Sequence, residues 1–321
     1  MRSRATMRPC SSRIAPSIFV PPRSIPIEGM RSMPCLGRAG EARSASMPAD
    51  VPCPLCGESR YRVFSERTRN RIVVCRGCGL YYVTPLPEAE AVERAVQHSD
   101  KYTEDQLAKE AFFRRRAVEL LEDVERRRGG PGRLLDVGCA IGSELAVARE
   151  RGWETIGLEL SGSSLAVARE RGHDVRAETL EGSGFAEARF DLVTLNHVLE
   201  HIPRPSAVLA EIHRVLAKDG LLFVAVPNVR TWWFYVKRQR YGWTFQDDHF
   251  LHFSVDTLAR LVRAHGFEIV DERTSRWVDY HEPPERRGPL WRALDAFAER
   301  HDLGIEIFCL ARRAPLGSNA P

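Results

Sequence analysis

Two hydrophobic periods alternate along the central part of the chain. Short apolar runs of strand length alternate with amphipathic segments of helix length. The strand-like runs are 133–138, 153–160, 174–178, 190–196 and 221–228, and the helix-like segments are 143–152, 163–172 and 206–220. Such alternation predicts right-handed βαβ crossovers and therefore an α/β fold with a doubly wound parallel sheet.

Further elements are predicted on both sides of this region. Residues 103–128 read as one amphipathic helix that ends at a GGPG stretch, and residues 254–266 read as another helix. Residues 267–277 and 305–313 predict two more strands. No apolar run reaches the roughly 18 residues of a membrane span, so we expect no membrane span.

The basic residues are concentrated at the start of the chain. Residues 1–49 hold eight arginines and two acidic residues, so the rest of the 321 residues is close to neutral. This balance disfavours nucleic acid as a partner. Residues 1–46 lack apolar periodicity and are predicted to be disordered, as is the tail 314–321. The N-terminal segment fits a transit peptide, or a start assigned too early with Met47 as the true beginning; without a secretory signal we expect a cytoplasmic protein.

Four of the eight cysteines form two CxxC pairs. Cys53 and Cys56 are separated from Cys75 and Cys78 by 18 residues. This spacing is typical of a structural Zn²⁺ site with four thiolate ligands, which predicts a zinc-ribbon-like module over 47–88 with strands at 71–75 and 80–85. Two disulfides are the alternative, and the lack of an export signal counts against them.

The role of this module stays open between three possibilities. Residues 58–71 read as a loop with five arginines, Tyr61 and Phe64, which leaves nucleic-acid binding possible. Docking of a partner is the second possibility, and a structural or substrate-capping role is the one we favour. Residues 89–130 then form a helical linker to a larger domain over 131–313.

Candidate ligand-binding residues follow the first two strands of the larger domain. Asp136 and the turn Gly138–Gly142 follow the first strand, and Glu159 ends the second. Ligands of such sheets bind beyond the carboxyl ends of the strands, where helix amides can hold a carboxylate or phosphate and Glu159 can accept ribose hydroxyls. A nicotinamide dinucleotide would use the same positions, so this pattern alone does not identify the cofactor.

The pattern over residues 130–272 resembles the class I S-adenosylmethionine (SAM) dependent methyltransferases. The matching stretches are LLDVGCAIG, GLELS, AETL, FDLVTLNHVLEHIPRP and EIHRVLAKDGLLFVAVPN. The resemblance implies a Rossmann-like sheet of seven strands that ends in antiparallel strands, with SAM as cofactor. Two departures are Ala140 in place of the usual middle glycine, which a methyl group can tolerate, and AKDG in place of a proline-containing turn.

The resemblance also implies roles for individual residues at the cofactor site. Asp136, Gly138, Ala140 and Gly142 form the turn, Glu159 binds the ribose, Leu160 and Ser161 flank the adenine and ribose, Glu178 and Thr179 contact the polar edge of the adenine, and Asn196 lies near the methionine end. An ordinary solvated role remains open for Glu178.

The HVLEH stretch is the candidate catalytic segment. If it is helical from its first residue, His197, Glu200 and His201 share one face. We expect His197 to act as a general base, with His249 or His252 from an aromatic lid over 227–253 completing the acceptor site. One alternative is that Glu200 and His201 only brace the helix, and another is that the lid is a docking surface. A third is that a divalent metal binds here, as in the ubiquinone-type O-methyltransferases, which look similar at this point. In this chain, however, His197 replaces an acid of their pattern.

These features predict methyl transfer from SAM to a small or carrier-borne metabolite, at oxygen. Carbon methylation of a nucleotide sugar is an alternative, because some such enzymes carry a four-cysteine zinc module before this fold. Methylation of ribosomal or transfer RNA and a non-catalytic, SAM-sensing module are further alternatives.

Overall fold

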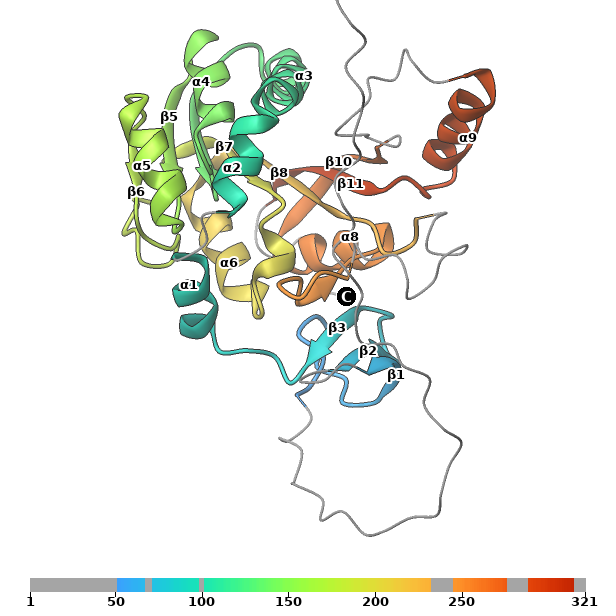
Figure 1. Cartoon of the computed structure of the whole chain (residues 1–321). Coiled ribbons are helices and arrows are strands. Elements are labelled where there is room, and N and C mark those ends of the chain that lie inside the picture. Colours follow the sequence, from blue (N-terminus) through green and yellow to red (C-terminus); the bar gives the residue numbers. More distant parts are fainter. Residues whose placement is uncertain (1–50, 67–70, 98–100, 232–244, 276–287, 315–321) are drawn as a thin grey trace, which may run out of the picture. The chain divides into compact units, whose positions relative to one another are not determined.

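The computed structural model describes residues 51–66, 71–97, 101–231, 245–275 and 288–314. All of them belong to one compact unit within residues 48–321. The described helices are all too short or too polar to cross a membrane. Figure 1 labels the helices and most of the strands discussed below; β4 and β9 carry no label in it.

A seven-stranded sheet forms the centre of this unit, in the order β10-β11-β8-β7-β4-β5-β6. Its strands are β4 (Arg133–Val137), β5 (Glu154–Leu158), β6 (Val175–Arg176), β7 (Phe190–Asn196), β8 (Leu216–Pro227), β10 (Phe267–Thr274) and β11 (Glu306–Arg313). Neighbours from β8 to β6 run parallel, whereas β11 is antiparallel to both β8 and β10. The predicted doubly wound sheet with antiparallel final strands is confirmed.

Helices cover both faces of this sheet, as Figure 1 shows. One apolar core joins the sheet to α3 (Glu110–Arg128), α4 (Ser143–Glu150) and α5 (Gly162–Glu170). A second core joins the opposite face to α6 (Pro205–Val215) and α8 (Val255–Ala264). In α3 the buried residues Ala117, Leu120, Leu121 and Val124 recur every three or four positions, as expected for one apolar face of a helix.

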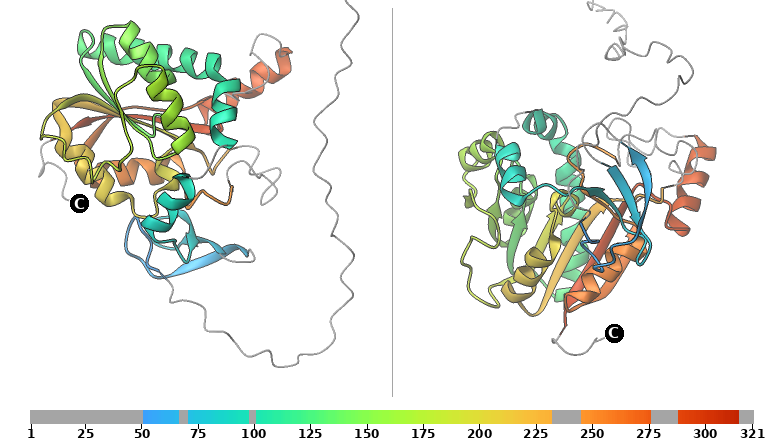
Figure 2. Two further views of the ribbon diagram at one scale, coloured as in Figure 1. Left: turned by 60° about the vertical axis from the view of Figure 1, so that its left-hand side comes forward. Right: turned by 90° about the horizontal axis from the view of Figure 1, so that it is seen from below.

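A smaller antiparallel sheet lies at the N-terminal side of the described chain, in the order β1-β2-β3-β9 (Figure 2). Three of its strands are consecutive, and the fourth comes from much later in the chain. They are β1 (Tyr61–Glu66), β2 (Arg71–Cys75), β3 (Tyr81–Thr84) and β9 (Leu251–His252). The predicted strands at 71–75 and 80–85 are present, but the expected loop at 58–71 is wrong in part, because β1 occupies 61–66 and pairs with β2.

The expected single helix over 103–128 is two helices. α2 (Lys101–Ala108) and α3 meet at Lys109, whose backbone leaves the helical region with φ −111° and ψ 14°. Each helix packs against a different partner: the Thr103 hydroxyl hydrogen-bonds to Ser163 and Ser164 of α5, whereas α3 packs on α4. Because the two helices pack against different partners, the helical chain must break between them. The amphipathic pattern alone does not indicate this break.

The boundary between α6 and β8 also differs from the expectation. The helix predicted to 220 ends at Val215, and β8 begins at Leu216, which pairs with Phe190 of β7. Leu216 is fully buried. The apolar stretch VLA, which resembles the end of a helix, therefore contributes to the sheet instead. Two helices, α1 (Ala89–Gln97) and α9 (Pro289–Arg300), have no counterpart among the predicted elements, although α1 falls within the predicted helical linker.

Candidate functional site

A cavity of about 900 Å³ opens at the carboxyl ends of the parallel strands. It lies where ligands of doubly wound sheets bind. The predicted site residues that line it are Asp136, Gly138, Ala140, Glu159, Leu160, Ser161, Glu178, Thr179, Asn196, His197, His201 and His249. Gly142 and His252 are not among the lining residues.

The glycine turn after β4 is tightly packed. A Cβ on Gly138, which has φ +75°, would lie 2.5 Å from Cγ2 of Val198, so no side chain fits there. Gly142 begins α4, and a Cβ there would lie 2.6 Å from the His173 ring. Gly142 therefore shapes the turn from behind rather than contacting the cavity.

Ala140 and Glu159 hold the turn to the next strand. The Ala140 amide donates to Oε2 of Glu159 at 2.8 Å, and the Ser161 amide donates to Oε1 at 2.7 Å. Ala140 adopts φ +50°, so the methyl group that we expected to be tolerated costs about 1–2 kcal/mol of backbone strain. Each Glu159 oxygen keeps acceptor capacity toward the cavity.

Two further carboxylates meet beside this turn. Asp136 is buried and accepts from the Thr194 hydroxyl at 3.1 Å, while Glu144 accepts from the Asn196 amide at 2.6 Å. Burial raises the pKa of Glu144 to about 7, and burial together with the Glu144 charge raises the pKa of Asp136. The Glu144 Oε1 atom is buried, and no hydrogen bond to it meets the geometric criteria among the described residues. A bound cation would stabilise the ionised form of both carboxylates.

The acidic residues of the cavity therefore help to distinguish SAM from a nicotinamide dinucleotide, the two cofactors that the turn pattern alone left open. Asp136, Glu144 and Glu159 surround the turn, and burial raises the pKa of all three, so they favour a ligand that brings positive charge over a dianionic pyrophosphate. SAM presents an ammonium and a sulfonium group, which such acids stabilise. The donor set fits SAM better than a dinucleotide.

The residues at the predicted adenine end make weaker hydrogen bonds than those around the glycine turn. Leu160 and Ser161 lie beside Glu159, and Arg176 places Nη1 3.4 Å from Oε1 of Glu178. Residues of α1 and α2 also line the cavity, among them Tyr102 and Gln106, whose side chains hydrogen-bond at 2.8 Å. The segment predicted as a linker therefore forms part of the cavity wall.

The HVLEH stretch is not helical from its first residue. His197 has φ +55°, and only Leu199–His201 forms a short 3-10 turn. The Nδ1 atom of His197 still lies 3.4 Å from Oε1 of Glu200. A left-handed residue at the end of β7 turns the chain sharply, so the three side chains converge without a shared helical face.

His197 is held between two carboxylates. Its Nε2 lies 2.6 Å from Oε1 of Glu306, and Glu306 also accepts from Nη1 of Arg116 at 2.9 Å. Burial lowers the pKa of His197, but the contacts with Glu200 and Glu306 outweigh it and raise the pKa to about 9. A histidine that is protonated at pH 7 is poorly suited to the general-base role that we expected for His197.

A second histidine cluster faces the same end of the cavity. The rings of His201 and His249 meet edge to face with centroids 4.8 Å apart, and one nitrogen of each ring and one Glu200 oxygen lie within 4.8 Å of one another. Nδ1 of His201 donates to the Asp248 carbonyl at 2.8 Å, which leaves Nε2 as the proton acceptor of the neutral ring. This geometry suits proton abstraction.

His252 does not share this position. It is buried in β9, and its ring packs against Phe245 at 4.8 Å between centroids. The expectation that His252 completes the acceptor site is therefore not supported by its placement. Of the predicted lid, residues 232–244 lie outside the described residues, whereas Gln246, Asp248 and Phe250 line the cavity.

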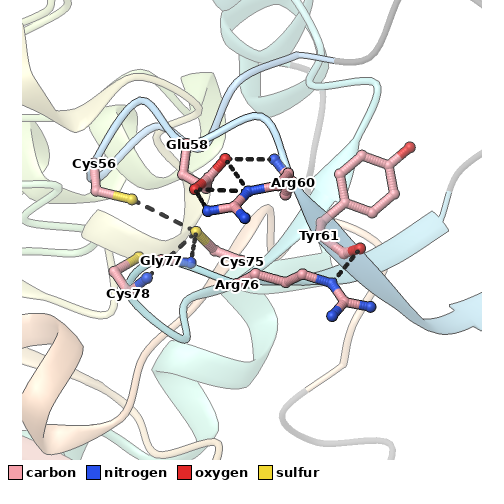
Figure 3. Close-up of polar contacts among 8 residues, drawn as sticks. All are labelled: Cys56, Glu58, Arg60, Tyr61, Cys75, Arg76, Gly77 and Cys78. Carbon is pink, nitrogen blue, oxygen red and sulfur yellow. Dashed lines mark hydrogen bonds and ion pairs between the residues drawn. The ribbon is translucent and has the colours of Figure 1, made fainter.

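The four cysteines of the CxxC pairs converge, as Figure 3 shows in part. Their sulfurs lie within 4.8 Å of one another, and the closest pairs, Cys53–Cys78 and Cys56–Cys75, are 3.5 Å apart. Sulfurs about 3.8 Å apart are expected around tetrahedral Zn²⁺ with Zn–S bonds of about 2.3 Å. The amides of Gly77 and Cys78 also point at the Cys75 sulfur. The donor set fits zinc, and all four cysteines are free thiols rather than disulfides.

Sequence reasoning missed two acids of the site. Glu306 is a lone acid within the apolar strand β11, and a buried charge needs a partner, so its position was a usable signal. Glu144 gave no such signal, because an acid in the first turn of a helix is commonly a surface residue that favours the helix dipole.

Comparisons with known proteins agree with this geometry. A family model described as a methyltransferase domain matches residues 98–272, more than half of the chain. C-methyltransferase NovU of Streptomyces niveus is 36% identical over 75 residues, which cover 23% of this chain and 17% of that protein. A ubiquinone biosynthesis O-methyltransferase of Glaesserella parasuis serovar 5 (strain SH0165) is 40% identical over 40 residues, covering 12% of this chain and again 17% of the relative.

The similarity to curated relatives is thus confined to about a sixth of their length. Among solved structures, a SAM-dependent methyltransferase of Thermotoga maritima, described as a possible histamine N-methyltransferase, superposes with a TM-score of 0.52. It is 18% identical, and the match covers 69% of this chain and 99% of that one. This likeness supports the fold.

Proposed function

The chain belongs to the class I SAM-dependent methyltransferases, and we propose that it methylates a hydroxyl group of a small or carrier-borne metabolite. The observation that carries this proposal is the division of one cavity into two ends. Acids surround the glycine turn at one end, and the imidazoles of His201 and His249 stand over Glu200 at the other.

At the cofactor end, Glu159 would bind the ribose hydroxyls, and Asp136 and Glu144 would stabilise the cationic methionine part of SAM. Bound SAM supplies an electrophilic methyl group. The chain's own contribution is to hold the acceptor oxygen in line with that methyl, about 3 Å away, which accounts for most of the expected acceleration.

At the acceptor end, Nε2 of His201 would accept the proton of the acceptor hydroxyl. Glu200 is buried and its pKa is lowered: burial opposes its charge, but His197, His201 and His249 outweigh that effect. The resulting carboxylate would stabilise the imidazolium that forms on His201. His197, already protonated, would keep Glu200 and Glu306 in place.

A labelled-methyl experiment tests this function. A cell extract is incubated with the protein and isotopically labelled SAM, and the labelled product is identified by mass spectrometry and NMR. With the acceptor known, His201→Ala should lower turnover by about 10²-fold or more, the scale of general-base catalysis, without changing SAM affinity. Near-normal turnover would eliminate His201 as the base.

Carbon methylation of a nucleotide sugar is the second candidate. The similarity to C-methyltransferase NovU and the four-cysteine cluster favour it. The same base would then remove a proton from a carbon next to a carbonyl group. Solvent deuterium entering the acceptor carbon in the presence of S-adenosylhomocysteine would indicate carbon methylation, and a methyl group on oxygen in the product would exclude it.

A further inference from the structure

The main chain of one residue, Phe250, connects the four-cysteine module to the acceptor end of the cavity. The Val83 amide of β3 donates to the Phe250 carbonyl at 2.9 Å, and the Phe250 amide donates to the Glu200 carbonyl at 2.9 Å. Phe250 therefore bridges the ribbon and the turn that carries Glu200. Its neighbour His249 lines the cavity.

The pairing of β3 with β9 continues this connection. Tyr81 lies opposite His252, and Tyr82 lies opposite Leu251. Tyr82 and Leu251 are almost fully buried and belong to one apolar core with Cys75 and Leu199. The backbone of residues 249–252 is thus fixed by the ribbon on one side.

The cysteine cluster determines where β3 begins. The Cys75 amide donates to the Leu80 carbonyl at 2.9 Å, and the Gly79 amide donates to the Cys75 carbonyl at 3.1 Å. This turn holds Cys75 and Cys78 together immediately before Tyr81, the first residue of β3. A metal bound by these sulfurs would therefore fix the start of the strand that contacts Phe250.

The cofactor end has no equivalent main-chain connection among the described residues, although Val137 of β4 and Leu158 of β5 share the apolar core that contains Cys75. Asp136, Glu144 and Glu159 belong to or directly follow β4, α4 and β5, and no strand of the smaller sheet pairs with β4 or β5. A structural change in the ribbon should therefore alter the acceptor end of the cavity and leave the cofactor end unchanged. The two ends can be measured separately.

We propose that the ribbon is a positioning element for the acceptor end, acting through the main chain of Val83, Phe250 and Glu200 to place His249 and the Glu200 turn. This inference rests on the proposed function, in which these residues face the acceptor, and its metal-removal test rests on zinc binding by the four cysteines. Val83 and the cysteines are positioning residues, because they touch neither acceptor nor cofactor in this arrangement.

A pair of proline variants tests the connection. Val83→Pro removes the amide that holds Phe250, and Val63→Pro introduces the same change into β1, at the far edge of the small sheet. Amide hydrogen exchange of residues 249–252, the NMR signals of the His249 and His201 rings, and S-adenosylhomocysteine affinity are measured in the full chain. None of these requires a known acceptor.

Val83→Pro should speed exchange of the Phe250 amide by roughly tenfold or more, the scale of one lost hydrogen bond, and should shift the His249 signal. Cofactor affinity should change less than twofold. Val63→Pro should leave the exchange and the His249 signal unchanged. Equal effects of both variants on the histidine rings, or no effect of Val83→Pro, would overturn the proposal.

A metal-removal arm covers the case in which Val83→Pro does not fold. Chelation of the wild-type protein should loosen residues 249–252 and shift the His249 signal, and Zn²⁺ but not Mg²⁺ should restore both. Loosening of the cofactor end to the same degree would indicate a general loss of stability and would contradict a positioning role. Purified protein without zinc would refute the proposed metal alone, because the Val83→Pro result would still decide the main-chain connection.

Discussion

Nε2 of His197 lies 2.6 Å from Oε1 of Glu306, in a buried contact between the end of β7 and the first residue of β11. Arg116 of α3 completes the arrangement by donating to the same carboxylate. The Arg116 charge and the His197 hydrogen bond outweigh burial and lower the pKa of Glu306 to about 2. Three distant segments thus share one charge network beneath the acceptor end of the cavity.

This network should make stability depend on pH on the alkaline side. The pKa of His197 rises from 6.5 to about 9 on folding, so its stabilisation is complete below pH 6.5 and is lost as pH rises through 9. The free energy of unfolding should fall by on the order of 2–3 kcal/mol between these limits. Urea unfolding from pH 6 to 9.5 measures this fall.

The variant His197→Gln provides the control for that measurement. Without an ionisable group at position 197, the alkaline fall should largely disappear, although the variant is less stable at pH 6. A fall of the same size in His197→Gln would assign the effect to another group. NMR titration of the His197 ring in the wild-type protein gives the pKa directly.

SAM affinity should increase with pH through about 7. Glu144 has its pKa raised to about 7 by burial, so it carries a proton below that pH when the cavity is empty. A cationic ligand favours the carboxylate, and binding should therefore release a proton. Between pH 6 and 8 the affinity should rise by roughly threefold to tenfold.

Calorimetry in buffers with different ionisation enthalpies counts the protons released. Glu144→Gln should bind SAM more weakly at pH 8 and should release fewer protons at pH 7. Asp136 faces Glu144 and Arg116 lies near it, so both contribute to the field at this site. Unchanged proton release in Glu144→Gln would assign the linkage to Asp136.

Removing the Glu159 carboxylate should weaken SAM and S-adenosylhomocysteine binding alike. Glu159→Ala loses the ribose acceptor and also releases the Ala140 and Ser161 amides, so affinity should drop by roughly 2 kcal/mol. Glu178→Ala is the comparison, because Glu178 lies at the polar edge proposed for the adenine and its described hydrogen bond is to the Arg176 side chain rather than to a backbone amide. Titration calorimetry that shows equal losses for both variants would contradict the role of Glu159.

The purified protein should contain about one Zn²⁺ per chain. Cys75→Ser should release the metal, because four thiolates are needed to close a structural site. Cys309→Ser is the matched control: Cys309 lies in β11 and is not part of the cluster. Elemental analysis decides the outcome, and metal-free wild-type protein would sink the prediction.

The local elements were predictable because each carries its own signal. β7 matches the apolar run 190–196 residue for residue, and Ser254 caps α8 at the predicted start of that helix. The CxxC spacing likewise predicted, from local sequence alone, that the four sulfurs lie close together. Asp136 and Glu159 line the cavity because the carboxyl ends of parallel strands lie at one edge.

Pairings between distant segments were not predictable in the same way. Nothing near His197 in the chain indicates that Glu306 is its partner, and the strand pattern before His197 does not predict its left-handed backbone. The two-residue strand β9 is also too short for a periodic signal, so its pairing with β3 is set by tertiary contacts. The charge of His197, which bears on the general-base role expected for it, therefore depends on a partner that the local sequence does not reveal.

The position of β9 bears on how the protein avoids self-association. An unpaired strand edge can add a strand from another molecule. β9 occupies the edge of the small sheet beside β3, yet the ribosome makes it long after β3 is complete. Until residues 251–252 emerge, the nascent ribbon therefore presents the open edge of β3 to neighbouring chains, and fragments that end before β9 should aggregate through that strand.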